Sequence, residues 1–141
     1  MTEQQKGALD LSAFDAAVKR QEQGIEVDIL GPDGETPIGL KIKVAGPDSQ
    51  RAQKAQEELA DGLLEKQARK GKIARVKPAE ARKRGIMYLA RVTIGWSPAV
   101  KLDGKELAYS VENAERLYTA LPFIREQVDE AGGDRARFMK G

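Results

Sequence analysis

Cysteine and histidine are both absent from the 141 residues of this chain. Their absence excludes disulfides, thiolate nucleophiles, histidine metal ligands and every catalytic arrangement that uses an imidazole base. Aromatic residues make up only 5% of the chain, and Trp96 is the single tryptophan. No apolar run approaches the roughly 20 residues of a membrane span, and the N-terminal sequence MTEQQKGALD lacks the apolar stretch of a signal peptide. We therefore expect a soluble, cytoplasmic protein with no catalytic residues, no metal site and no cofactor.

The chain also has little excess of one charge, because it contains 24 Lys and Arg residues and 22 Asp and Glu residues, for a net charge of +2. The exception is the segment Lys66–Arg84, where nine basic residues accompany the single acid Glu80, a local charge of +8 that leaves −6 for the rest of the chain. A basic segment can bind phosphates, but this one has no aromatic side chain to stack on bases. We interpret it as a mobile, solvated linker and do not expect nucleic acid as a partner.

Known phosphate-binding and catalytic motifs are missing from the sequence as well. The turn GPDGETP lacks the G-x-x-x-x-G-K-[ST] spacing of a phosphate-binding loop, and no G-x-G-x-x-G stands between a predicted strand and helix. Carboxylate pairs such as Asp28 with Asp33 are expected by chance among 22 acids. General acid–base catalysis needs carboxyls held in a cleft in different environments, which no motif here predicts.

Alternation of apolar and polar residues is the clearest local pattern that is present. It occurs in IEVDIL and again in IGLKIKV, with the turn sequence GPDGETP between them. The pattern predicts a β-hairpin with one apolar face, on whose other face Glu26 and Asp28 oppose Lys41 and Lys43. Because an isolated hairpin is only marginally stable, we expect helices of the same chain or another sheet to cover its apolar face. We also expect its edge to pair or be covered on self-association.

Helical patterns flank this hairpin. Ser12 is the candidate N-cap of a short helix whose apolar face carries Phe14, Ala17 and Val18, and Gly24 is placed to end it.

After the hairpin, GPDS predicts a second helix with Asp48 or Ser49 as its N-cap. Ala and Leu recur along it at helical spacing, and Gly71 is placed to stop it.

The stretch that begins at Pro78 has two interpretations. Proline in the first turn and Gly95 as a stop predict one helix over residues 78–94. The sequence MYLARVTI within it also alternates like a strand, and the β-branched residues of its second half support that alternative. We favour the helix because it has a capped start and a glycine stop.

The C-terminal third is rich in turn and cap residues. Asp103-Gly104 predicts a tight turn with positive φ at both positions. Ser110 is the expected N-cap of a helix, and Pro122 ends that helix and begins another.

The predicted fold class is therefore α+β, with an N-terminal β-hairpin packed with several α-helices and a mainly helical C-terminal half. We expect residues 1–9 to form a flexible tail and residues 10–141 to form a single domain.

Two stretches carry a resemblance to a known family, namely IEVDILGPDGETPIGLKIKVAGPDSQ and GWSPAVKLDGKELAYSVENAERLYTALPFIREQVDE. The matching features are the Gly95-Trp96 step, the Leu102-Asp103-Gly104 turn, the Tyr109-Ser110-x-Glu112-Asn113-Ala114 helix entry, the Pro122 break, Gln127 and the closing Asp134-Arg135-x-x-Phe138. In these features residues 24–139 resemble the small tail assembly chaperones of long-tailed bacteriophages and related tail-like elements. The segment Lys66–Arg84 departs from that family, being longer and more basic.

The resemblance implies a non-enzymatic protein in the host cell cytoplasm. Members of that family engage the long helical tape-measure protein, keep it soluble and help tail-tube subunits polymerise around it. The implied partners are thus the tape-measure protein and the tail-tube protein, with a homo-oligomer as a further expected state and no membrane. Two alternatives remain open: a small structural component of the tail or head–tail region, and a nucleic-acid-binding module that uses the basic segment.

Four aromatic residues are the candidates for partner binding: Trp96, Tyr109, Tyr118 and Phe123. The simple interpretation is that all four pack in the core. The functional alternative is that one or two of them line a groove for a partner helix, because aromatic side chains dominate binding energy where they are accessible. We take Trp96 and Phe123 as the candidate anchors.

Overall fold

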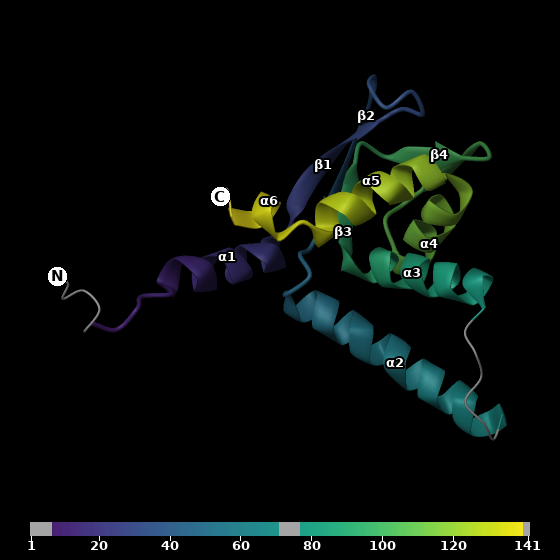
Figure 1. The fold of residues 1–141 in the computed structure, drawn as a ribbon. Coiled ribbons are helices and arrows are strands. Elements are labelled where there is room, and N and C mark those ends of the chain that lie inside the picture. The colour runs from purple at the N-terminus through teal and green to yellow at the C-terminus, as the bar shows by residue number, and fades with distance from the viewer. Residues whose placement is uncertain (1–6, 71–76, 140–141) are drawn as a thin grey trace.

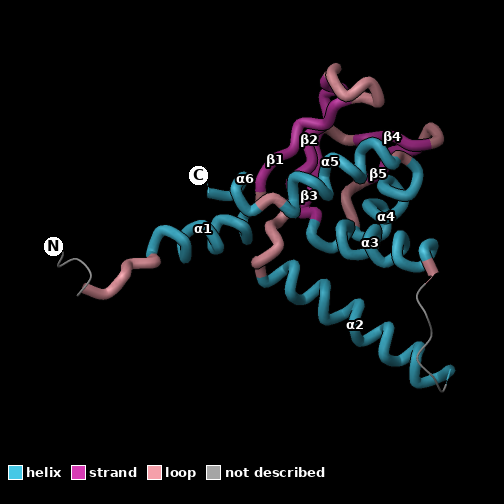
Figure 2. Tube along the Cα trace, viewed as in Figure 1, coloured by secondary structure: helices cyan, strands magenta, loops and turns pink. Residues whose placement is uncertain are grey.

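The computed structural model describes residues 7–70 and 77–139 of the chain. These residues form helices and short antiparallel strands, which confirms the α+β class and the mainly helical C-terminal half (Figures 1 and 2). In chain order the elements are α1 (Ser12–Gln23), β1 (Ile25–Leu30), β2 (Pro37–Val44), α2 (Gln50–Lys70), α3 (Pro78–Val92), β3 (Thr93–Ser97), β4 (Val100–Leu102), β5 (Lys105–Leu107), α4 (Val111–Ala120), α5 (Pro122–Gly133) and α6 (Arg135–Met139).

The hairpin of β1 and β2 forms with the register that the alternation predicts. Glu26 lies opposite Lys43 and Asp28 lies opposite Lys41. The carboxylate of Asp28 and the ammonium of Lys41 are 4.0 Å apart and exposed, so this pair contributes little to stability. The register of the hairpin is instead fixed by the apolar side chains of the other face, because a slip of one residue would expose all of them to water.

A third strand corrects the prediction of one helix over residues 78–94. Helix α3 ends at Val92, and β3 then pairs antiparallel with β2, with Trp96 opposite Ile42. The predicted stop at Gly95 is therefore wrong, and the strand alternative holds for Thr93 and Ile94. These β-branched residues favour an extended backbone, and the edge of β2 offers the hydrogen-bonding partners that a helical turn would otherwise supply.

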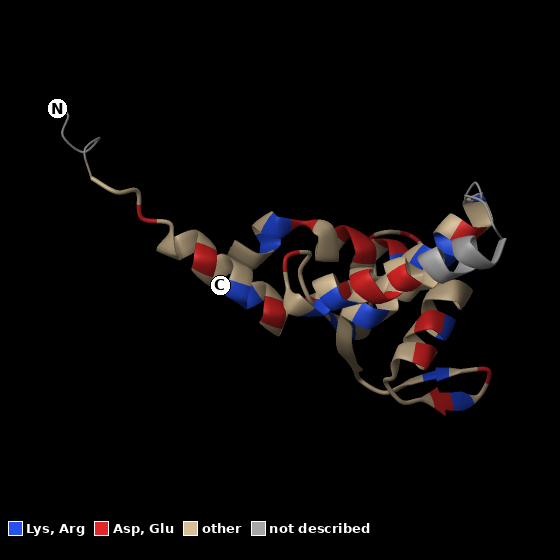
Figure 3. Cartoon of the chain, turned by 90° about the horizontal axis from the view of Figure 1, so that it is seen from below, with Lys and Arg blue, Asp and Glu red and all other residues tan. Residues whose placement is uncertain are grey.

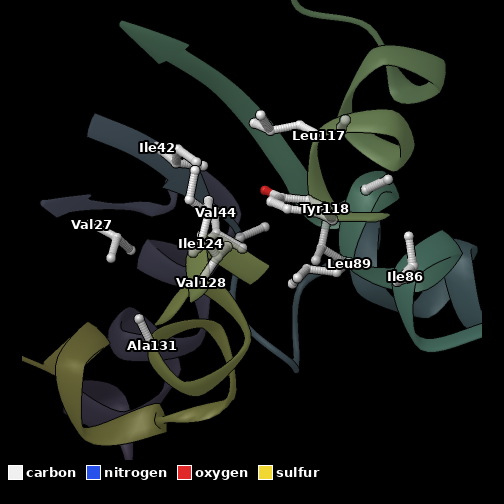
Figure 4. Packing of buried hydrophobic residues seen from close by; sticks show 14 of the residues in the cluster. Val27, Ile42, Val44, Ile86, Leu89, Leu117, Tyr118, Ile124, Val128 and Ala131 are labelled. Carbon is white, nitrogen blue, oxygen red and sulfur yellow. The ribbon is translucent and has the colours of Figure 1, made fainter. Parts of the chain in front are cut away.

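The apolar face of the sheet is covered within the chain, as expected. Helix α5 lies against β1 and β2 (Figure 1), and the side chains of Val27, Ile42, Val44, Ile124 and Val128 meet in the core between them (Figure 4). Because this face is already buried in a single copy, the hairpin does not need self-association to cover it.

One residue of the hairpin's expected apolar face is exposed. Ile38, at the start of β2, is 47% exposed. It lies next to the turn between β1 and β2, at the end of the hairpin that extends away from the helices (Figure 1).

Most helix starts follow the sequence signals. Ser49 Oγ accepts the N–H of Ala52 at 3.1 Å, and Ser110 Oγ accepts the N–H of Asn113 at 3.0 Å. Pro78 occupies the first turn of α3.

The prediction of Ser12 as an N-cap is wrong. Leu11 is the N-cap residue of α1, and Ser12 is the first residue inside the helix. The carboxylate of Asp10 accepts the backbone N–H of Ser12 at 2.9 Å and so satisfies one of the free N–H groups of this first turn.

The turn between β4 and β5 has the predicted geometry. Asp103 has φ 55° and Gly104 has φ 76°, so both central residues adopt the left-handed conformation that Asp-Gly favours.

Two predictions concern regions that are partly outside the described residues. Residues 1–6 of the expected tail are not described, and neither are residues 71–76 in the middle of the basic segment Lys66–Arg84.

Candidate functional site

Trp96 and Tyr109 form one aromatic pair beside the core. Their ring centroids are 5.2 Å apart and the ring planes are at 86°, an edge-to-face contact of the kind that adds to simple burial. The hydroxyl of Tyr109 donates to the carbonyl oxygen of Thr93, which ties β3 to the segment before α4. Both rings are partly buried against the core.

Tyr118 is fully buried and does not lie on any surface (Figure 4). Its hydroxyl is 2.7 Å from Thr93 Oγ1, which donates its only proton to the carbonyl of Leu89 at 2.8 Å. Tyr118 is therefore the donor in the pair. Burial raises the pKa of Tyr118 well above the ordinary phenol value. The expectation that Tyr118 contacts a partner is wrong for this conformation, because no partner atom can reach it.

Phe123 lies on a different part of the molecule, in the first turn of α5. It is partly buried against the core and borders a cleft of about 430 Å³ between α5 and the turn that follows β1. The cleft is mostly lined by polar and backbone groups, among them the side chains of Glu126, Gln127 and Glu130. The two anchors expected from the sequence are thus not brought together into one groove.

A second cleft, of about 590 Å³, lies between α2, α3 and the start of α4. Acidic and basic side chains alternate around it, and Arg91 is 3.6 Å from the carboxylate of Glu58 and 3.2 Å from that of Glu115. Because the charges compensate one another, this cleft has no single-sign surface for a charged ligand. Figure 3 shows the same mixing of acidic and basic residues along much of the chain.

The carboxyls whose pKa is shifted are shifted downward. A hydrogen bond from the Thr36 hydroxyl lowers the pKa of Asp33 to about 2. The guanidinium of Arg135 does the same for Asp48, whose pKa is also about 2. Such carboxyls stay ionised near neutral pH, so they are unsuited to donate a proton as general acids. Among the described residues no group of three acidic side chains is placed to hold a metal ion.

The most unusual surface is an apolar stripe on α1. Leu11, Phe14 and Val18 recur at the spacing of one helix face and are 54%, 57% and 42% exposed. We call these three residues the α1 stripe. The sequence led us to expect Phe14, Ala17 and Val18 on the buried face, but only Ala17 is buried. Helix α1 leads away from the body of the molecule (Figure 1), and the side chains of its stripe are exposed.

The body holds the C-terminal half of α1, through a buried glutamine. Gln21 is 3% exposed, its amide nitrogen donates to Asp48 Oδ2 at 3.1 Å, and its amide oxygen accepts the Asp48 N–H at 2.6 Å. The Arg135 guanidinium binds both oxygens of Asp48 at 2.7 and 2.8 Å. A polar network thus links α1, α6 and the loop before α2.

This network fixes which part of α1 packs on the body. Phe14 lies seven residues before Gln21 and therefore projects from the same side of α1. It is exposed because the N-terminal part of α1 extends beyond the body (Figure 1). The α1 stripe could not be predicted from the sequence, because hydrophobic periodicity shows that a helix has an apolar side but not how much of the helix the body covers. The attachment through Gln21 depends on Asp48, which lies 27 residues further along the chain.

Comparison of the chain with known protein families, with curated proteins and with solved structures found no match. None of the helices in the described ranges combines the length and the low charge that a membrane span requires.

Proposed function

We propose that this chain is a non-enzymatic tail assembly chaperone that binds an apolar helical segment of the tape-measure protein. It acts in the host cell cytoplasm, keeps that protein soluble and assists the polymerisation of tail-tube subunits around it. The observation that carries the proposal is the α1 stripe, because a helix that presents Leu11, Phe14 and Val18 to water is suited to helix–helix recognition.

Charged residues at the border of the α1 stripe support its role in binding a partner helix. Asp15 and Lys19 lie beside it, form an ion pair at 3.1 Å and remain largely exposed. Charges around an apolar contact keep the free protein soluble and steer the encounter with a partner, while the apolar contact supplies most of the affinity. The family resemblance supplies the identity of the partner, and the composition, without cysteine or histidine, agrees with a binding role.

Co-expression with the tape-measure protein tests the proposal. The tape-measure protein should be soluble with the wild-type chain and insoluble without it. The double variant Phe14→Asp, Val18→Asp should lose this effect, because it puts two charges in the middle of the stripe. Ile38→Asp is the matched control, since Ile38 is as exposed as the stripe residues but lies on β2, and it should keep the effect.

The same co-expression assay tests Trp96 and Phe123, the two anchors expected from the sequence. Trp96→Ala and Phe123→Ala should leave the tape-measure protein soluble as long as circular dichroism shows an intact fold, because both rings pack on the core and lie off α1. A tape-measure protein that is equally soluble with and without this chain would refute the chaperone function. The tape-measure protein could instead become insoluble with Trp96→Ala or Phe123→Ala and stay soluble with the double variant of the α1 stripe. The contact would then lie on the body and not on α1.

A further inference from the structure

We infer that α1 is a detachable arm, which opens from the body together with α6 while the sheet and helices α3, α4 and α5 stay folded. The starting point is that one side of α1 has two kinds of surroundings. Ala17 and Gln21 are buried there, whereas Phe14 and Val18 of the α1 stripe, on the same side, are exposed. The body therefore covers only part of a continuous helix face.

The apolar contact that holds α1 is small. Among the described residues, the buried members of the main core cluster come from the sheet, from the loop after β2 and from helices α2 to α5, and none comes from α1 or α6. Helix α1 buries the apolar side chain of Ala17, which has little area to lose to water, and α6 buries that of Phe138. The two helices lie side by side (Figure 1). They thus pack on each other outside the core that stabilises the rest of the chain.

Polar bonds make up much of the remaining attachment. Arg20 donates to the carbonyl oxygens of Phe138 at 3.0 Å and Met139 at 3.2 Å, at the end of α6. Glu22 accepts the backbone N–H of Gln50 at 2.6 Å, at the start of α2. Because water replaces such hydrogen bonds when a helix leaves the body, each of them opposes the opening only weakly.

Asp48, in the loop before α2, joins the two helices. Its carboxylate accepts hydrogen bonds from the Gln21 side chain of α1 and from the Arg135 guanidinium of α6. When either helix moves away, the same carboxylate loses a partner and its hold on the other helix weakens. This shared acceptor is the reason that α1 and α6 open as one unit.

Gly24 is the pivot between α1 and the sheet. Its φ of 82° is a conformation that glycine adopts without strain. A Cβ atom there would lie 2.8 Å from the carbonyl oxygen of Val44 and 2.7 Å from Ile94 Cδ1, so Gly24 is held close to the sheet. Helix α1 ends one residue earlier, at Gln23. The arm therefore turns about the junction of residues 23 and 24 and leaves the sheet undisturbed.

The opening changes what the α1 stripe can bind, a consequence that rests on the proposed function. In the closed form the exposed stripe runs from Leu11 to Val18, a length of about 10 Å or two helical turns. A partner helix that continues along the same side meets the groups that cover Ala17 and Gln21. Release of the arm adds these residues to the contact, so the body competes with the partner for one face of α1.

Hydrogen–deuterium exchange of two neighbouring amides measures the opening in the wild-type chain. The N–H of Gly46 donates to the carbonyl oxygen of Gln21 in α1 at 2.9 Å, and the N–H of Ala45 donates to that of Val92 in α3 at 2.8 Å. After correction for intrinsic rates, the Gly46 amide should exchange at least about 100-fold faster, because only the Ala45 amide requires the body to open. Equal exchange of the two amides would overturn the inference.

Thiol labelling distinguishes opening of α1 from opening of the loop alone. The chain has no cysteine, so Ala17→Cys puts a single thiol into the contact of α1 with the body. Ala131→Cys, at a fully buried position of α5, is the matched control. The first thiol should react at least about 100-fold faster than the second, with little dependence on low urea concentrations, because the opening exposes little surface. Equal labelling of the two would overturn the arm, and so would labelling of Ala17→Cys as fast as in the unfolded chain.

Two substitutions on α6 test its coupling to α1. Arg135→Ala removes the guanidinium from Asp48 and should speed exchange of the Gly46 amide about tenfold, with the neighbouring control amide unchanged. Arg137→Ala on the same helix is the matched control, since the ion pair of Arg137 is with Asp134, and it should leave both amides unchanged. Equal effects of the two substitutions would overturn the joint opening of α1 and α6.

Added tape-measure protein separates the opening from the proposed function. When the partner occupies the whole face of α1, the Gly46 amide should exchange faster still, because Gln21 no longer accepts its hydrogen bond. Fast exchange in the free chain without this further increase would keep the arm and contradict the competition with the partner. Slow exchange in the free chain, with the tape-measure protein still made soluble on co-expression, would overturn the arm and leave the proposed function in place.

Discussion

Gln127 on α5 makes two hydrogen bonds to the backbone of Leu30 at the end of β1. Its amide oxygen accepts the Leu30 N–H at 2.8 Å, and its amide nitrogen donates to the Leu30 carbonyl at 2.8 Å. The side chain thus takes the place of a neighbouring strand at the outer edge of the sheet. A strand edge whose backbone groups are satisfied is less able to pair with another chain.

Gln127→Ala should therefore destabilise the protein by about 1–3 kcal/mol, because it leaves both backbone groups of Leu30 without these partners. Gln127→Glu should also destabilise it, since a carboxylate accepts the N–H but cannot donate to the carbonyl. Urea unfolding measures both variants. Gln53→Ala, at an exposed position of α2, is the control. A Gln127→Ala variant as stable as this control would show that the two hydrogen bonds contribute nothing.

Stability should fall at high pH because of the tyrosines. Burial raises the pKa of Tyr88, Tyr109 and Tyr118 in the folded chain. The unfolded chain releases these phenolic protons near pH 10 whereas the folded chain retains them, so the free energy of unfolding should decrease as the pH rises above about 10.

Phenolate absorbance and urea unfolding as functions of pH check this. Tyr118→Phe removes the most strongly shifted group, so the decrease of stability with pH should become shallower. Ordinary titration of all three tyrosines in a chain that keeps its near-ultraviolet circular dichroism would contradict the burial described above.

The attachment of α1 should depend on Gly46. A Cβ atom at Gly46 would lie 2.5 Å from Gln21 Cγ and 2.6 Å from Gln21 Cβ, too close for either to remain in place. We expect Gly46→Ala to destabilise the protein by about 1–3 kcal/mol and to loosen α1. Gly85→Ala is the matched control, because a Cβ there meets no atom within 4 Å and alanine favours the helix. Its unfolding free energy should rise by about 0.5–1 kcal/mol. Equal effects of the two substitutions would refute the close approach to Gln21.

The parts of the fold that local chemistry determines could be predicted from the sequence. The period-two pattern gave the hairpin and its charge register, and Ser49, Ser110, Pro78 and Asp103 marked the ends of elements through their own hydrogen bonds or backbone preferences. Each of these signals acts within a few residues of its position, so no knowledge of distant contacts is needed.

The parts of the fold that depend on contacts between residues far apart in the sequence could not be predicted. Thr93 and Ile94 fit a helix or a strand equally well by pattern, and the choice is made by the edge of β2, about 50 residues earlier. The orientation of α1 is likewise determined by the contact of Gln21 with Asp48. The aromatic residues were the obvious anchors in the sequence, but their rings pack on the core, while the exposed apolar surface that we propose as the contact lies on α1.

Hydrogen–deuterium exchange of the chain with and without the tape-measure protein tests the central claim most directly. Measured at a concentration where the free chain is monomeric, the amides of α1 around Phe14 and Val18 should become protected on binding. The amides of β3 and of the first turn of α5 should change little. Protection at Trp96 or Phe123 with none in α1 would contradict the account, because the contact would then lie on the body and not on the α1 stripe.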